Sequence, residues 1–296
     1  MKSAVILPPT HTAGDDILDE DKGAIVLATH ELRPLECARD DVADALRSID
    51  DADWYVQYEA IETFRRALVH HAPAAGPHLG DVLAIFSAAS LNLRSATSKN
   101  ALLALAECFE FGDVTALPLL HVVQALMKRA ACEKKFLRDA ATLAIAKLTT
   151  HAPTWPVLVS LAAYSSSKSA KLVAAACNGT MLCLLQMQVD AAILNPTQII
   201  EVLPALARFR NGKDAKARED ALVGLNVVAS FAGGSDIFEK LVSTAIADKV
   251  AATKVLQAVI ASNKRKALAR APLTTGLRAA LQSRKQQQLQ PPTVVE

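Results

Sequence analysis

Apolar residues recur along this chain with the 3.6-residue period of an α-helix. Six apolar stretches open successive units: DVADALRSI, DVLAIFSAA, ALPLLHVVQALM, WPVLVSLAAY, IIEVLPALARF and IFEKLVSTAIA. Each is followed by a polar turn of roughly three to six residues, a usual length between paired helices, and then by an Ala-rich helical stretch. The second stretches begin near Trp54, Asn92, Glu133, Ser167, Gly212 and Asp248. The pattern predicts six helix pairs.

The pairs recur at a spacing of about 39 residues, in the range of two-helix HEAT units. Prolines fall between the units, where they suit helix starts and turns. Leu and Val stripes would be buried between two rows of helices, and small Ala faces let the helices approach closely. We therefore predict an all-α fold, an α-solenoid of about six HEAT-like helix pairs over residues 36–263.

The two flanks of this repeat differ from it. Residues 1–35 are acidic and weakly patterned, which is typical of a loose arm or partial cap. Residues 264–296 begin with the basic stretch KRKALARAP and continue into a run rich in Gln and Pro. This composition predicts a helix that frays into a disordered tail.

Composition agrees with a helical protein. Apolar residues make up 51% of the chain and aromatic residues 4%, with 11 glycines, whereas a β-sandwich would use more β-branched and aromatic residues. No window reaches the roughly 18 consecutive apolar residues of a membrane span, and MKSAVILPPT is too short for a secretory signal. The five cysteines form no CxxC pair, which favours reduced, mostly buried thiols. We expect an intracellular protein without a membrane segment.

Charge is distributed unevenly. Residues 1–53 carry 5 Lys or Arg against 13 Asp or Glu, whereas residues 205–296 carry 15 against 7. After Asp248 no acidic residue occurs before Glu296. The C-terminal end is therefore a candidate for contact with an acidic surface.

Catalytic and cofactor motifs are missing from the sequence. It contains no GxxxxGK[ST], GxGxxG, HExxH or GxSxG. The acidic stretch DDILDEDKG lacks the spacing of a calcium-binding EF-hand loop. We expect no enzymatic activity, no cofactor and no metal.

The turns inside the pairs carry the candidate site. In a solenoid these turns line up along one edge, and here they read DDADW, SLNLRS, CEKKF, SSSKS, RNGKD and ADKV. The candidate binding residues on this edge are Trp54, Arg94, Lys134, Lys135, Lys168 and Lys213, with Lys249 in the last turn. Two interpretations stay open. Trp54 either docks into a partner, as aromatic residues at interfaces do, or folds back on Tyr58 or on the preceding helix, with the basic residues merely solvated.

Several stretches resemble TOG domains, which are six-unit HEAT paddles that bind tubulin. DADWYVQYEAI resembles the first-turn signature, with Trp54 at the tubulin-contacting tryptophan. The second-unit likeness rests on Leu93, Arg94, Ser95, Lys99, Ala101 and Phe109, and the third-unit likeness on Lys135, Phe136, Arg138 and Ala140. SSSKSAKLVAAACNGTMLCLL and DAKAREDALVGL look like the fourth and fifth second-helix openings. The likeness covers about residues 40–232 and is strongest to the crescerin group of ciliary TOG-array proteins, with the CLASP type next.

The resemblance implies binding of αβ-tubulin or the microtubule lattice along the turn edge. Trp54 and the second turn would face one tubulin subunit, and the basic fourth and fifth turns the other. It also implies a cytoplasmic, cytoskeletal location, in a cilium, flagellum or axoneme. An alternative is a HEAT adaptor for a partner other than tubulin, with Trp54 buried. Nucleic-acid binding through the basic tail is less favoured, and it would make the helical repeat dispensable for binding.

Overall fold

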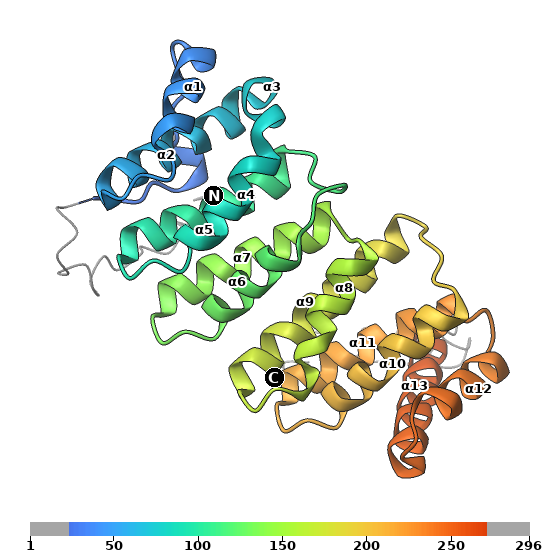
Figure 1. Cartoon of the computed structure of the whole chain (residues 1–296). Helices are drawn as coiled ribbons and strands as arrows, with labels where there is room; N and C mark the ends of the chain where they lie inside the picture. The colour runs from blue at the N-terminus through green and yellow to red at the C-terminus, as the bar shows by residue number, and fades with distance from the viewer. Residues whose placement is uncertain (1–23, 271–296) are drawn as a thin grey trace, which may run out of the picture. The chain divides into compact units, whose positions relative to one another are not determined.

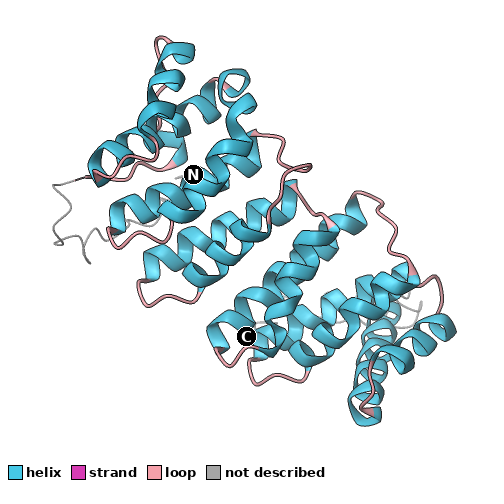
Figure 2. Ribbon diagram, viewed as in Figure 1, coloured by secondary structure: helices cyan, strands magenta, loops and turns pink. Residues whose placement is uncertain are grey.

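The computed structural model describes residues 24–270, with side chains described as far as residue 265. All regular structure in this part is helical, and no strand occurs in it (Figures 1 and 2). The all-α prediction is confirmed. The contacts divide the chain into two compact units, one ending at Ala191 and the other beginning at Ala192, and each is described by itself.

The first unit contains four helix pairs. Its elements are η1 (Thr29–Glu31), α1 (Ala38–Ser48), α2 (Trp54–His70), α3 (Ala72–Ala75), η2 (Gly76–His78), α4 (Leu79–Ala89), α5 (Ser95–Phe111), α6 (Leu120–Ala130), α7 (Lys135–His151), α8 (Trp155–Ala162), η3 (Ala163–Ser166) and α9 (Ala170–Val189). The pairs are α1–α2, α4–α5, α6–α7 and α8–α9. The second helices α2, α5, α7 and α9 lie side by side in one row, and α4, α6 and α8 form the other (Figure 1).

Two of the second helices of this unit, α2 and α9, begin directly after a side chain that caps them. The Asp53 carboxylate accepts a hydrogen bond from the N–H of Tyr55 (2.8 Å) at the start of α2. The Ser169 hydroxyl accepts one from Leu172 (3.4 Å) at the start of α9. Such caps satisfy backbone donors that have no partner within the helix. The acidic run before Trp54 is thus partly explained by helix capping.

The core of the first unit lies between the two rows of helices. The most buried helix is α5, whose side chains are covered on nearly every face from Ala96 to Phe109. The largest fully buried apolar side chains of this unit are Phe64, Phe86, Phe109, Ile49, Ile61, Leu68, Leu83, Leu102, Leu105 and Leu126. Each such side chain contributes about 1.5–3 kcal/mol relative to remaining exposed. The apolar stripes read from the sequence are therefore the faces that pack.

Helix α9 is long and apolar. Its 20 residues have a mean hydropathy of 1.5 over an 18-residue window, which is enough by length and composition to cross a membrane. About 44% of that window is buried inside the protein, where α9 packs against α7 and α8. Core helices meet the same criteria, and the packing of α9 is that of a core helix.

Gly179 marks the closest approach in this packing. A Cβ atom there would lie 3.1 Å from Cγ2 of Ile145 and 3.2 Å from Cδ1 of Leu161. We expect Gly179→Val to lower the free energy of unfolding by about 1–3 kcal/mol, because the added methyl groups overpack the core. Chemical denaturation measures this loss.

Gly76 provides the matched control, since a Cβ there meets nothing within 4 Å. Gly76→Val is expected to change the stability by no more than about 0.5 kcal/mol. Equal losses for the two variants would show that the approach of α9 to its neighbours is not tight.

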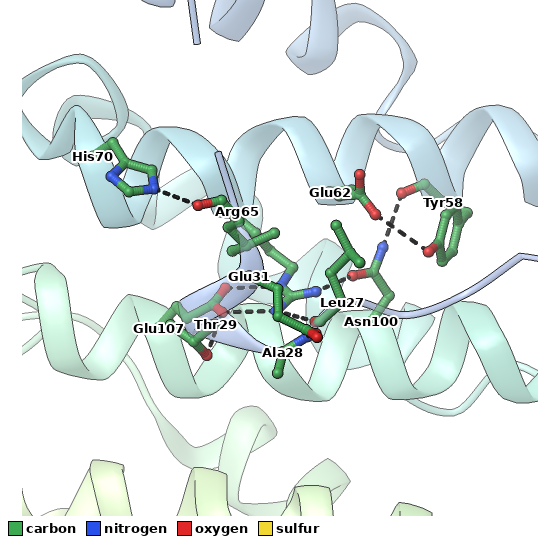
Figure 3. A network of polar contacts seen from close by, with 11 residues as sticks. Leu27, Ala28, Thr29, Glu31, Tyr58, Glu62, Arg65, His70, Asn100 and Glu107 are labelled. Carbon is green, nitrogen blue, oxygen red and sulfur yellow. Dashed lines mark hydrogen bonds and ion pairs between the residues drawn. The ribbon is translucent and has the colours of Figure 1, made fainter. Parts of the chain in front are cut away.

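Residues 24–35, here called the strap, run along α2 ahead of α1 (Figure 3). The Tyr58 hydroxyl donates to the Ile25 carbonyl (2.8 Å) at one end, and the Arg66 guanidinium donates to the Arg33 carbonyl (2.9 Å) at the other. Further contacts join His70 Nε2 to the Leu32 carbonyl (2.7 Å), Arg66 to the Pro34 carbonyl (3.0 Å) and the Leu35 N–H to His71 Nε2 (3.1 Å). Of the segment that the sequence assigns to an arm, the strap is thus bound to α2, and residues 1–23 lie outside the described part.

A buried ion pair lies beneath the strap. Arg65 of α2 and Glu107 of α5 are 0% and 1% exposed and form two hydrogen bonds of 2.8 Å. Arg65 also donates to Asn100 (2.8 Å) and to the Leu27 carbonyl (3.0 Å), and Thr29 donates to Glu107 (2.8 Å). The strap therefore supplies partners to both members of the pair (Figure 3).

The second unit contains two helix pairs. Its elements are α10 (Pro196–Arg210), α11 (Ala215–Phe231), α12 (Ser235–Ala245) and α13 (Lys249–Arg270). A capping box opens α10, in which Asn195 and Gln198 exchange backbone-to-side-chain hydrogen bonds of 2.9 and 3.0 Å. Helix α10 packs on α11 and α12, and α13 packs on α11 and α12. The six predicted pairs are thus present in the described residues, four in one unit and two in the other. Of the basic tail, residues 264–270 continue α13, and residues 271–296 lie outside the described part.

Candidate functional site

Four turns join the helices within the pairs of the first unit. Turn 1 is residues 49–53, turn 2 is residues 90–94, turn 3 is residues 131–134 and turn 4 is residues 167–169. Each turn leads directly into a second helix, and the second helices lie side by side. The four turns and the first residues of α2, α5, α7 and α9 are here called the turn edge (Figure 1).

Trp54 lies at the first position of α2 and is partly exposed. Its ring meets the ring of Tyr55 edge-on, with centroids 5.6 Å apart. The guanidinium of Arg94, from turn 2, lies 5.7 Å from the centroid of the Trp54 ring, within cation–π range. The ring that stacks on Tyr58 is that of Tyr55 (6.2 Å). Trp54 is therefore placed between its own helix and the neighbouring turn.

Turn 2 is held from several sides. Arg129 of α6 donates to the carbonyls of Ser90 (2.6 Å) and Asn92 (2.8 Å), and the Ser98 hydroxyl donates to Ser90 as well (2.6 Å). Leu93, which directly precedes Arg94 in this turn, is 97% exposed. These hydrogen bonds fix the backbone of turn 2, so the Leu93 side chain is exposed to solvent on a turn of defined conformation. Leu93 was not among the predicted binding residues, although an apolar residue inside a polar turn is a signal that the sequence contained.

Turn 3 is closed by Arg138 of α7, which donates to the carbonyls of Cys132 (2.9 Å) and Glu133. Lys134 is exposed, and its ammonium group donates to the Ser95 hydroxyl at the start of α5 (2.7 Å). Lys134 thus connects turn 3 to the helix that follows turn 2. Its charge stays at the surface, where a partner can reach it.

The remaining lysines of the edge differ in their contacts. Lys135 is exposed and pairs with Asp139, one turn along α7 (2.7 Å). Lys168 of turn 4 is exposed. Lys171 of α9 pairs with Glu133 of turn 3 (2.8 Å), and both side chains are largely in solvent. Contacts between turns and the starts of neighbouring second helices therefore run along the edge from α2 to α9.

The structure brings five of the six predicted residues to the turn edge of the first unit, namely Trp54, Arg94, Lys134, Lys135 and Lys168. Lys213 lies in the second unit, in the turn between α10 and α11. It is exposed, and its carbonyl accepts a hydrogen bond from Arg218 (2.7 Å). Within the described residues, no three His, Cys, Asp or Glu side chains gather into a group that could hold a metal.

The contact between turn 3 and the start of α9 affects the pKa of Glu133. The hydrogen bond and the charge of Lys171 lower the pKa of Glu133 from its ordinary value. The ionised carboxylate is therefore favoured in the folded chain, and this contribution is present above the unfolded pKa and is lost as the pH falls through the folded pKa. We expect Lys171→Ala to raise the pKa of Glu133 toward its ordinary value, as measured by NMR titration of its carboxyl carbon.

Lys168→Ala is the matched control, since it removes a lysine of the same edge that does not pair with Glu133 in the structure. The pKa of Glu133 is expected to stay low in this variant. A rise of the same size in both variants would show that the summed positive charge of the turn edge, and not the Lys171 contact, lowers the pKa of Glu133.

No family model matches the chain. Among solved structures, one of crescerin, described as using a TOG domain array to regulate microtubules in the primary cilium, is 17% identical over 79% of this chain and 91% of that chain, with a TM-score of 0.48. Two engineered proteins are 14% and 16% identical, over 76% and 74% of this chain and 97% and 96% of theirs, with TM-scores of 0.40 and 0.41. A TOG structure is thus among the structural neighbours, and the helical-repeat fold itself rests on the chain's own helix pairs.

Proposed function

We propose that this chain binds αβ-tubulin or the microtubule lattice through the turn edge of its first unit and thereby regulates microtubules. The observation that carries the proposal is the arrangement at turns 1 and 2. A partly exposed Trp54 is held between Tyr55 and Arg94. Leu93, which precedes Arg94 in sequence, is almost fully exposed. Trp, Tyr and Arg are the residues that most often dominate binding energy at protein interfaces. Tubulin as the partner follows from the sequence resemblance to TOG domains.

The charge of the edge suits an acidic partner. Arg94, Lys134 and Lys168 add positive charge to turns 2, 3 and 4, and Lys213 is proposed to add a contact from the second unit. Charges at the rim of an interface mainly speed association and set its orientation, and salt screens them. The basic tail is proposed to add affinity for acidic surfaces in the same way. A location in a cilium or flagellum is proposed from the sequence resemblance to the crescerin group.

Co-elution with αβ-tubulin in size-exclusion chromatography, at low and at moderate salt, tests the proposal. The intact chain is compared with Trp54→Ala and with a chain ending at Asn263. A complex that is lost with Trp54→Ala and kept by the shortened chain supports the turn edge as the binding site. Absence of a complex with the intact chain contradicts the proposal. A complex that is lost only in the shortened chain would mean that the basic tail, and not the turn edge, binds tubulin.

A HEAT adaptor for another protein is the second candidate. It is favoured by the contacts that lysines of the edge make within the chain, since Lys134 bonds to Ser95 and Lys135 pairs with Asp139. Charge reversal at Lys168 separates the two candidates. Tubulin binding predicts a loss for Lys168→Glu and none for Arg39→Glu, which reverses an exposed charge at the first turn of α1. An adaptor predicts that neither variant changes the response to tubulin.

A further inference from the structure

We propose that the strap orients Trp54 through Tyr58 and Tyr55, so that a segment distant from the binding edge in sequence determines how the edge is presented. The inference rests on the proposed function for its effect on binding. The orienting contacts themselves lie within the chain and are measurable without any partner. They form a continuous series from residue 25 to turn 2.

The first contact in the series joins the strap to Tyr58. The Tyr58 hydroxyl donates to the Ile25 carbonyl (2.8 Å). It also lies 3.3 Å from the Glu62 carboxylate (Figure 3). The ring is buried, at 5% exposure, and the Tyr58 backbone carbonyl accepts from Asn100 of α5 (2.9 Å). Burial raises the pKa of Tyr58, so the hydroxyl keeps its proton and donates at neutral pH. Tyr58 is therefore fixed by both the strap and α5.

The next contacts join Tyr58 to Trp54. The rings of Tyr58 and Tyr55 are stacked, 6.2 Å apart with their planes 23° from parallel. The pKa of Tyr55 is raised, first by its hydrogen bond to Glu59 and then by the charge of that carboxylate. Trp54 meets Tyr55 edge-on at 88° and has Arg94 over its ring. A shift of the Tyr55 ring would therefore remove one of the contacts that set the Trp54 orientation.

Orientation matters for binding because a side chain that is already held loses less freedom in the complex. Immobilising one side chain at an interface costs an amount equal to about a two- to tenfold change in affinity. By holding Trp54 before binding, the strap would increase the affinity by this factor without contacting the partner. Tyr58 and Tyr55 are then positioning residues for Trp54.

Two variants separate this role from general support of the fold. Tyr58→Phe removes the hydroxyl that holds the strap at Ile25 and keeps the stacked ring. Arg66→Ala removes contacts at the other end of the strap, where Arg66 donates to the Arg33 and Pro34 carbonyls. Both are made together with Trp155→Phe, which leaves Trp54 as the single tryptophan of the chain. Fluorescence anisotropy and acrylamide quenching then report on Trp54 alone, and tubulin affinity is measured on the same proteins.

We expect Tyr58→Phe to lower the anisotropy of Trp54, to raise its quenching by acrylamide and to weaken tubulin binding about two- to tenfold. Arg66→Ala is expected to leave all three unchanged. Equal changes in both variants, or an unchanged Trp54 signal in Tyr58→Phe, would overturn the proposal. If the fluorescence follows the expected order and tubulin binds none of the proteins, the positioning holds and the proposed function fails.

Discussion

Glu107→Ala is expected to lower the free energy of unfolding of the first unit by about 3–5 kcal/mol, the usual loss when one member of a buried ion pair is removed. Arg65 would remain charged and buried, with Asn100 and the Leu27 carbonyl as its remaining partners. Thr29 would also lose its acceptor, so the strap should loosen. Chemical denaturation measures the loss of stability, and hydrogen exchange of the strap amides measures the loosening.

Two controls identify the cause. Glu110→Ala breaks the pair of Glu110 with Lys147, whose side chains are 30% and 29% exposed, and it is expected to cost no more than about 1 kcal/mol. Replacing both members of the buried pair, Arg65→Met with Glu107→Leu, is expected to recover most of the loss, because no buried charge is then left without a partner. A loss for Glu107→Ala no larger than that for Glu110→Ala would contradict the prediction.

The helices and turns could be predicted because their signals are local. The period of the apolar residues places the start of the second helix at Trp54, and the structure begins α2 there with Asp53 as its cap. Prolines and polar turns likewise separate the pairs. These features depend on residues a few positions apart, which is the range that a sequence pattern covers.

The buried ion pair could not be predicted, because its members lie 42 positions apart and look like ordinary charged residues of helix surfaces. The course of the strap along α2 depends on the same packing. The division of the repeat at Ala191 has no signal in the helix pattern.

The candidate site shows the same limit. The basic residues of the edge could be read from the turns, but their contacts depend on how neighbouring pairs stack. Lys134 reaches Ser95 and Lys171 reaches Glu133 only because α5, α7 and α9 lie side by side. The residue types of the turns therefore locate the turn edge in the sequence. The packing of the helices determines which of its basic side chains form hydrogen bonds or ion pairs within the chain.

Trp54→Ala is expected to weaken tubulin binding by about thirtyfold or more, the loss for an aromatic residue that dominates an interface. The indole offers a large apolar surface at the edge, and Arg94 and Tyr55 hold it there. Because Trp54 is partly exposed, its removal opens no large cavity in the core, and stability should change by less than about 1 kcal/mol. Titration of labelled tubulin at fixed salt measures the affinity, and thermal unfolding measures the stability.

Trp155→Ala is the matched control, since it removes the other tryptophan from the first position of α8, a first helix whose start is separated from turn 4 by the whole length of that helix. Tubulin affinity is expected to stay within about twofold of the intact chain, a change smaller than the loss of a single net hydrogen bond.

The salt dependence of tubulin binding separates the contribution of Trp54 from that of the basic residues. The basic residues remain in Trp54→Ala, so added salt should weaken its residual binding by the same factor as in the intact chain. Unchanged affinity in Trp54→Ala would mean that the indole serves to connect the start of α2 to turn 2, and that tubulin contacts the chain at other residues.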